Sequence, residues 1–210
     1  MAIRVQFSMK SLGLILVVCA TGAALFAYSR SHIIRRNRTV DKLLAERASV
    51  VWDFEIGGAE PKTRRDVLLG RYSQHYVASV HVHEQISLDT IRSIRSFSRL
   101  DLIHLGPHVL NDKVAALLTD VRSCRVLESS YATIGAKGLQ SICSLPNLVE
   151  LDLSNANGLT SLSPIANLSK LRHLILDGAV FDGSTVEFLC SCKSLLLLSK
   201  LMLLFQPGGW

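Results

Sequence analysis

The chain has 210 residues, 49% of them apolar, and a formal net charge of +6 at pH 7. The basic residues gather in 30–47 and 62–65, with no interleaved aromatic residues and no recognised nucleic-acid-binding module, so nucleic acid is not an expected partner. The five cysteines are odd in number and lack a C-x-x-C pair, which argues against a disulfide framework and favours small core residues in a reducing compartment.

The N-terminal part of the chain predicts a single membrane anchor. Residues 1–10 form a short basic tail, and residues 11–28 follow with 18 residues and no charge. As a helix this run would span about 27 Å, close to the thickness of about 30 Å of a bilayer's hydrocarbon core. We therefore expect a transmembrane helix at 11–28 in a single-pass protein, with the lipid bilayer as its partner.

The alternative for this apolar run is a cleaved signal peptide, because the small residues 22–24 could form a cleavage site. We favour a retained anchor, since the run continues to Tyr28 and ends at a denser basic cluster. More basic residues follow the run than precede it, so the positive-inside rule places the C-terminal part of the chain in the cytoplasm. The following residues are Arg30, Arg35, Arg36, Arg38 and Lys42, and the preceding ones are Arg4 and Lys10.

Two short segments connect the anchor to the rest of the chain. Residues 29–49 predict a basic juxtamembrane helix or linker, in which 35–48 has one partly apolar face. Residues 50–76 predict an N-terminal capping region, with a β-like run at the start and a short helical stretch at 63–72. Because so few residues would struggle to fold alone, we expect them to cover the core of the region that begins at residue 77. The covering side chains are expected to be Trp52, Phe54 and Leu68.

A leucine repeat organises residues 77–194. The segment L-x-x-L-x-L at 148–153 returns 23 residues later at 171–176, and the same register extends backwards to units that begin at 124, 100 and 77. A repeat of this kind and period is the signature of leucine-rich repeats, with one short strand in each turn of a solenoid. Between the strands, helical spacing predicts helices over 112–121, 136–145 and 183–189, and a brief helix or 3₁₀ turn at Pro164. The predicted fold class is therefore an α/β leucine-rich-repeat solenoid of about five strand–helix units of 23–24 residues.

The stretch LVELDLSNANGLTSLSPIANLSKLRHLIL, together with the basic start, the apolar segment, the Arg-rich continuation and VVWDFE, resembles the planctomycete-type family of membrane-anchored bacterial leucine-rich-repeat proteins. The resemblance covers roughly 77–193. It implies the repeat fold but little about function, because the family is mostly uncharacterised. One departure concerns the position three after the last leucine, where Asn, Cys or Thr is usual. That position holds Gln85, His108, Ala132, Ala156 and Ala179, so alanine packing is expected in place of an asparagine ladder.

The repeat register predicts which side chains line the exposed concave face of the strands. The residue between the last two leucine positions is His81, His104, Glu128, Asp152 and Ile175 in successive units. Because neighbouring strands lie about 4.8 Å apart, these side chains should form a column. We expect this face to bind an unknown protein partner. The candidate binding residues are His81, His83, His104, Glu128, Glu150, Asp152, His173 and Asp177.

A metal or another ligand is the alternative occupant of the concave face, held by His81, His83 and His104. These histidines lack a specific ligand spacing such as H-E-x-x-H, so we expect neither a metal nor a cofactor. The sequence also lacks a G-x-S-x-G elbow, a P-loop and a dinucleotide fingerprint, and Cys190-Ser191-Cys192 is expected to pack in the core. We therefore expect a membrane-anchored protein–protein interaction module with no catalytic residues, and not an enzyme.

The C-terminal residues 195–210 depart from the repeat. A sixth unit should begin near Leu195, yet the sequence there is apolar without the usual alternation. A terminal repeat normally presents a polar outer face. We expect an irregular apolar tail that is a truncated or degenerate repeat, with a membrane-dipping segment and a dimer contact as the alternatives.

Overall fold

The computed structural model describes residues 9–53, 76–84, 86–180 and 197–199. The chain divides into two compact units, Met1–Arg38 and Thr39–Trp210, which we describe separately. The predicted helices at 63–72 and 183–189, and the side chains of Phe54, Leu68, Gln85 and residues 190–192, lie outside the described residues.

In the described residues the first unit is the part of helix α1 (Met9–Ala45) that ends at Arg38, and the last turns of this helix belong to the second unit. Among the described residues, the segment Val17–Ala45 is one helix that is long and apolar enough to cross a membrane, judged by length and composition. The apolar side chains of Val17 and Phe26 are about two-thirds exposed, at 60% and 68%. The hydroxyl of Thr21 donates to the carbonyl of Val17 at 3.0 Å, so this polar group is satisfied inside its own helix.

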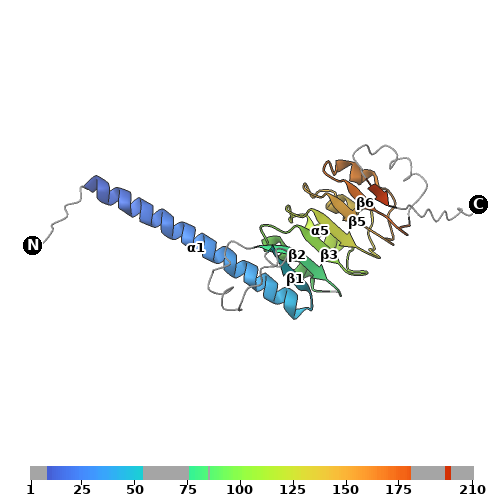
Figure 1. Ribbon diagram of the computed structural model, residues 1–210, viewed down its shortest axis with the longest axis horizontal. Helices are drawn as coiled ribbons and strands as arrows, with labels where there is room; N and C mark the ends of the chain where they lie inside the picture. The colour runs from blue at the N-terminus through green and yellow to red at the C-terminus, as the bar shows by residue number, and fades with distance from the viewer. Residues whose placement is uncertain (1–8, 54–75, 85, 181–196, 200–210) are drawn as a thin grey trace, which may run out of the picture. The chain divides into compact units, whose positions relative to one another are not determined.

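The second unit contains a sheet in which the strands follow one another in chain order (Figure 1). Strand β1 (Ser49–Trp52) is antiparallel to β2 (Val77–Val82). Every later strand in the described part of the chain is parallel to the one before it. These later strands are β3 (Leu102–Leu105), β4 (Val126–Ser129), β5 (Glu150–Asp152), β6 (His173–Ile175) and β7 (Leu197–Ser199).

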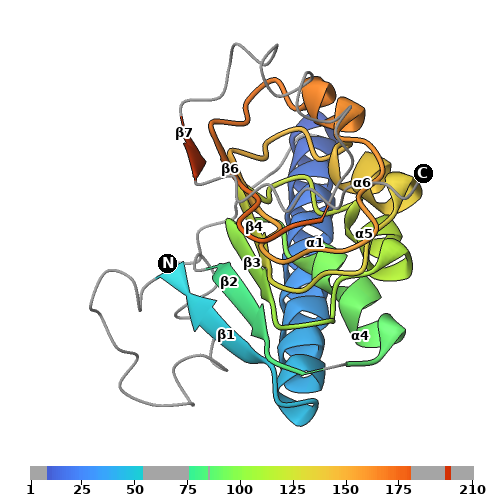
Figure 2. The same cartoon turned by 90° about the vertical axis from the view of Figure 1, so that its right-hand side faces the viewer.

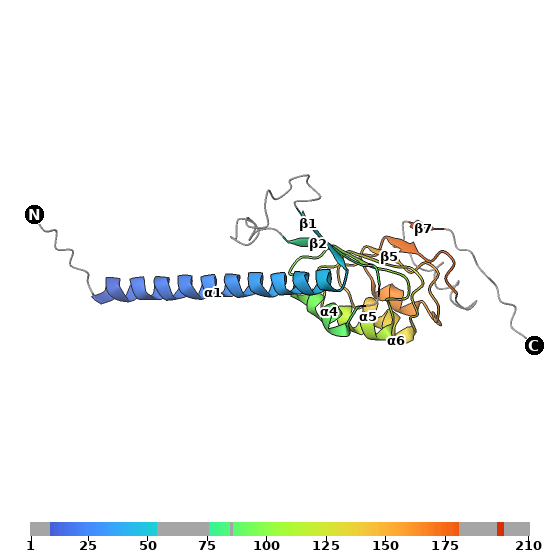
Figure 3. The ribbon, with the colours of Figure 1, turned by 90° about the horizontal axis from the view of Figure 1, so that it is seen from below.

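The segments between consecutive strands from β2 to β6 carry short helices on one side of the sheet (Figures 2 and 3). The predicted mixed α/β class with a parallel sheet is therefore confirmed. The 3₁₀ helix η2 has Pro164 in its first turn, where a missing amide hydrogen costs nothing. The helices that follow β2 were not predicted from the sequence. The helical elements are α4 (Leu88–Ser93), η1 (Ile94–Ser96), α5 (Asp112–Leu118), α6 (Ala136–Ile142) and η2 (Ser163–Asn167).

The core lies between the sheet and these helices. In β4 the side chain of Leu127 is fully buried, whereas Val126 and Glu128 on either side are half-buried, because successive side chains of a strand point to opposite faces. Burial of one such aliphatic side chain stabilises a fold by about 1.5–3 kcal/mol. The side chains that stand beside Leu127 in register on β3, β5 and β6 are also fully buried, and these are Ile103, Leu151 and Leu174.

Backbone hydrogen bonds link the points where successive strands begin. The carbonyl of Asp101 accepts from the amides of both Arg125 and Val126, each at 2.9 Å. One strand further, the carbonyl of Arg125 accepts in the same way from the amides of Val149 and Glu150. We call this arrangement the entry ladder. It depends on main-chain atoms, so the side chains at these positions take no part in it.

The turns that follow the strands share a left-handed backbone conformation. His108, Tyr131 and Asn155 have φ values of 60°, 55° and 56°, and Gly178 has 68°. The next residue of each turn is buried, and in the segment after β3 that residue is Val109. In that segment the position three after the last leucine is His108, which is exposed, and Val109 takes the inward position because the turn contains one extra residue. The buried residues are Val109, Ala132, Ala156 and Ala179.

The last turns of α1 pack against the first strands and helices of the second unit. Val40 and Leu43 are part of its core, and the hydroxyls of Thr39 and Ser96 are 2.8 Å apart. The second unit therefore begins at Thr39, within the segment for which the sequence predicted a juxtamembrane helix or linker. Trp52 of β1 is half-buried against the same core.

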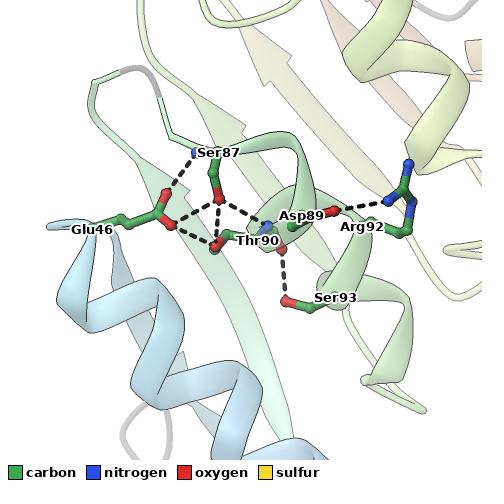
Figure 4. A network of polar contacts seen from close by, with 6 residues as sticks. All are labelled: Glu46, Ser87, Asp89, Thr90, Arg92 and Ser93. Carbon is green, nitrogen blue, oxygen red and sulfur yellow. Dashed lines mark hydrogen bonds and ion pairs between the residues drawn. The ribbon is translucent and has the colours of Figure 1, made fainter.

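The carboxylate of Glu46 anchors this packing (Figure 4). It accepts from the backbone amide of Ser87 at 2.6 Å, from the Ser87 hydroxyl at 2.8 Å and from the Thr90 hydroxyl at 2.7 Å. The hydrogen bond from Thr90 is the main reason why the pKa of Glu46 is lowered, and those from Ser87 add to it. Ser87 in turn caps α4 by accepting from the amide of Thr90. The end of α1 and the start of α4 are thus held by one charged acceptor.

At the other end of the sheet, Leu197–Ser199 forms β7 and pairs with β6. This segment lies in the stretch for which the sequence predicted an irregular tail. The remaining residues of that stretch lie outside the described part of the chain.

Candidate functional site

The exposed side of the parallel strands, opposite the helices, is the candidate site, and we call it the strand face. Register places His81 beside His104, His104 beside Glu128, Glu128 beside Asp152 and Asp152 beside Ile175. This is the column that the leucine register predicted, and its pairing is confirmed. Glu150 and His173 are paired in the neighbouring column of the same face. The structure therefore brings most of the predicted site residues together on adjacent strands.

His104 and Glu128 form a close pair in the centre of the strand face. The His104 Nδ1 and Glu128 Oε2 atoms are 3.0 Å apart, and each side chain is 34% exposed. The pair is therefore open to solvent but partly shielded by its neighbours. It becomes an ion pair when the imidazole takes up a proton, because the ring then carries a positive charge beside the carboxylate.

His173 and Glu150 repeat this arrangement on the next pair of strands. The His173 Nδ1 and Glu150 Oε2 atoms are 3.3 Å apart, with 45% of the histidine and 30% of the glutamate side chain exposed. The direction of the pair is reversed, since here the histidine belongs to the later strand. Both glutamates of the strand face thus have an imidazole within hydrogen-bonding distance.

The histidines at the start of the strand face are held by each other and by serine hydroxyls. The rings of His81 and His104 have centroids 5.6 Å apart, and the rings of His81 and His83 stack at 6.5 Å. Ser79 Oγ lies 3.0 Å from His81 Nε2, and Ser49 Oγ of β1 lies 3.3 Å from His83 Nε2. Burial lowers the pKa of His81, and the neighbouring imidazoles of His104 and His83 lower it further, although Glu128 acts in the opposite direction.

Asp152 has a different environment from the two glutamates. Its Oδ1 atom accepts from the backbone amide of Ser154 at 2.8 Å and from the Ser154 hydroxyl at 2.5 Å. These bonds hold the carboxylate in place without a histidine. Asp177 lies beyond the end of β6 at the edge of the strand face, and its backbone carbonyl accepts from the amide of Asn155 at 2.7 Å.

The strand face and its border carry opposite kinds of charge. At the described outward positions of β2 to β6 and the residues that follow them, there is no lysine and no arginine. The exposed residues just before the strands are instead often basic. The basic residues of this border are Arg99, Arg122, Arg125, Lys170 and Arg172.

Several residues of the strand face were not predicted from the sequence. Leu102 and Val126 lie half-buried on this face, in the same column as Glu150 and beside the column that contains His104 and Glu128. The alternation of the strands could have identified both, because each stands two residues before a predicted site residue. They give the face an apolar component beside its charged groups. The contacts between serines and His81, His83 and Asp152 could not have been predicted, since the positions of serines in the sequence say nothing about their hydrogen bonds.

Two further observations concern groups that could bind metals or react as thiols. No group of three or more His, Cys, Asp or Glu side chains in the described part of the chain is arranged to hold a metal ion. Cys124 and Cys143 are buried, which raises the pKa of each to about 12. A thiol in that state is a packing residue and a poor nucleophile, because the reactive form is the thiolate.

Comparisons of the chain with models of protein families and with curated proteins returned no match. The function is therefore inferred from the geometry and charge of the strand face.

Proposed function

We propose that this chain is a membrane-anchored leucine-rich-repeat protein that binds another protein through its strand face and performs no catalysis. The observation that carries the proposal is the strand face itself. It presents charged and apolar side chains in register over several adjacent strands, and in the described residues it is left open by the helices, which lie on the other side. Surfaces of this type are suited to extended contacts with protein partners.

The repeat part of the proposal is supported by the connectivity. Each parallel strand returns to the same register after 23 or 24 residues, as in the pairs His81–His104 and His104–Glu128. The chain between two strands passes through a helix on one side, and this is the plan of a leucine-rich-repeat solenoid. The likeness to the planctomycete-type membrane-anchored family rests on the sequence features quoted above, and membership of that family is part of the proposal.

The membrane part of the proposal is supported by α1. The helix would be about 55 Å long, which exceeds the hydrocarbon core of a bilayer by a wide margin. In this proposal residues 11–28 span the membrane, and the second unit lies in the cytoplasm, because the positive-inside rule favours that side for the basic residues that follow the span. Extraction of isolated membranes at alkaline pH tests the anchor, since an integral protein stays in the pellet. A C-terminal fluorescent protein that matures only in the cytoplasm tests the orientation.

Site-specific photo-crosslinking of the full chain in its native membrane tests the binding face. A photoreactive amino acid at Asp152 is expected to give a crosslinked product of one defined mass. The same residue at Gln140, which is exposed on helix α6, serves as the matched control and should give none. Charge reversal by Glu128→Lys should abolish the product at Asp152. Crosslinks that form from Gln140 and not from Asp152 would overturn the proposal, because the partner would then bind the helix side.

A further inference from the structure

The charge of the strand face changes with pH more than that of its surroundings. Glu128, Glu150 and Asp152 are its carboxylates on β4 and β5, and no lysine or arginine occupies the described outward positions of these strands or their neighbours. At neutral pH, with neutral imidazoles, these positions are therefore negative. The charge changes of histidine lie between about pH 5 and pH 8, so mild acidification adds positive charge to this same face.

The two glutamates are the groups most affected, because each has a histidine as its neighbour on the adjacent strand. The distances of 3.0 Å for His104–Glu128 and 3.3 Å for His173–Glu150 are those of direct contact. A protonated imidazole at this distance is a counter-ion that belongs to the protein itself. It would compete for the carboxylate with any positive group of a partner.

The groups that surround each pair determine which histidines can act in this way. His104 faces His81 on β2 and Glu128 on β4, and Glu128 faces Asp152 on β5. His173 faces Glu150 on β5, and the backbone of β7 pairs with that of β6 on its other side. His81 lies among imidazoles and is partly buried, so it is the histidine that resists protonation. The two histidines in contact with glutamates are therefore the ones whose charge acts directly on those carboxylates.

Resting on the function proposed above, we propose that the strand face binds a cationic protein segment, rich in lysine or arginine, and that protonation of His104 and His173 releases it. At neutral pH the carboxylates of Glu128 and Glu150 are available to the partner's ammonium or guanidinium groups. After acidification the two protonated histidines form ion pairs with these carboxylates, which are then no longer available to the partner. Asp152, held by Ser154 and not by a histidine, binds the partner equally in both states.

Binding of a labelled octalysine peptide tests the proposal. The full chain is held in uncharged detergent at low ionic strength, and fluorescence anisotropy is measured at about pH 7.5 and about pH 5.5, on either side of the histidine range. We expect about tenfold weaker binding at the lower pH, because two exposed charge pairs of up to about 1 kcal/mol each are lost and 1.4 kcal/mol corresponds to a factor of ten.

Matched variants separate the histidine effect from the general gain of positive charge. The double variant His104→Gln/His173→Gln should bind equally well at both pH values, whereas His108→Gln, an exposed histidine in a turn, should keep the wild-type response. Glu128→Gln/Glu150→Gln should weaken binding at the higher pH and remove the response. Asp152→Asn should weaken binding by the same factor at both pH values. Thermal unfolding of each variant confirms that it is folded.

Three results would overturn this inference. The first is tighter binding of octaglutamate than of octalysine, the second is a pH response that survives in the double histidine variant, and the third is binding that does not depend on the two glutamates. None of these results affects the photo-crosslinking from Asp152 in the native membrane. If the crosslink forms while the peptide assay fails, the strand face is still the binding surface and only the predicted charge of the partner is wrong.

Discussion

Replacement of Gly138 by alanine tests how closely helices α5 and α6 are packed. In an ordinary helix this change stabilises by about 1 kcal/mol, because glycine is a poor helix former. Here a Cβ atom would overlap Asp112 Oδ1, and it would lie 2.6 Å from Ile134 Cγ1 and 3.0 Å from the Asp112 Cα atom. The Cα atom belongs to the backbone of the neighbouring helix and cannot rotate away.

The expected cost follows from these contacts. Overpacking of a core position costs about 1–3 kcal/mol. Displacement of the Asp112 carboxylate would also weaken the hydrogen bond of 2.8 Å that it accepts from the amide of Gly135, which in an exposed place is worth about 1 kcal/mol. Together these costs exceed the gain in helix propensity, and we expect Gly138→Ala to lower the free energy of unfolding by about 2 kcal/mol.

Urea unfolding of the full chain in mild detergent measures this change. In a Trp210→Phe background the fluorescence of Trp52, which packs against the core, reports on the second unit alone. Gln140→Ala, at an exposed position of the same helix, is the matched control and should change stability by less than about 0.5 kcal/mol. A Gly138→Ala variant as stable as the wild type, or more stable, would refute the close packing of α5 against α6.

Three further changes have defined outcomes. Glu46→Gln should destabilise the second unit by no more than about 1 kcal/mol at neutral pH, since solvent screens this carboxylate. The pKa of Glu46 in the folded protein is below the ordinary 4.5, so the stability that its carboxylate contributes is fully present above pH 4.5 and is lost as the pH falls through the lowered pKa. The melting temperatures of the wild type and the variant should therefore converge at low pH. Ser129→Ala should raise stability by about 1 kcal/mol, because the Ser129 hydroxyl is buried without a hydrogen-bond partner among the described residues. Cys124 and Cys143 should resist alkylation by iodoacetamide at about pH 8 until the protein is unfolded, as judged by peptide mass spectrometry, because their thiolates form only near a pKa of about 12.

Each of these outcomes has a clear opposite. A constant difference in melting temperature between wild type and Glu46→Gln down to low pH would show that the carboxylate charge has no role in the network. A loss of stability in Ser129→Ala would show that the hydroxyl does find a partner. Rapid alkylation of Cys124 in the folded protein would place that thiol at the surface.

The strand face was predictable because two independent periodicities agree there. The leucine positions return every 23 or 24 residues, and the strand alternates with a period of two. Together they fix which side chain stands beside which, so the pairing of His104 with Glu128 followed from spacing alone. The local contacts did not follow. Whether Glu150 would meet His173 or a residue of its own strand depends on rotamers, which spacing does not determine.

The ends of the second unit were harder to predict for a different reason. Thr39, Val40 and Leu43 lie in a basic segment that looks like a linker, and only their packing against the first strand and helices places them in the core. The inward position of Val109 was missed because a single extra residue, in the turn after β3, shifts the register locally. A repeat pattern predicts its own regular part well, but it carries no information on the segments that close it.

The entry ladder holds successive strands together through hydrogen bonds that do not depend on the side chains of the binding surface. At its successive rungs the acceptors are the carbonyls of Asp101, Arg125 and Val149, one acidic residue, one basic and one apolar. Because these hydrogen bonds use only main-chain atoms, the side chains at these positions and on the strand face can be substituted without weakening the contact between successive strand–helix units. Partner choice can therefore evolve, or be engineered, largely independently of folding. A variant library restricted to the strand face should consequently retain a high proportion of folded members while it samples new binding specificities.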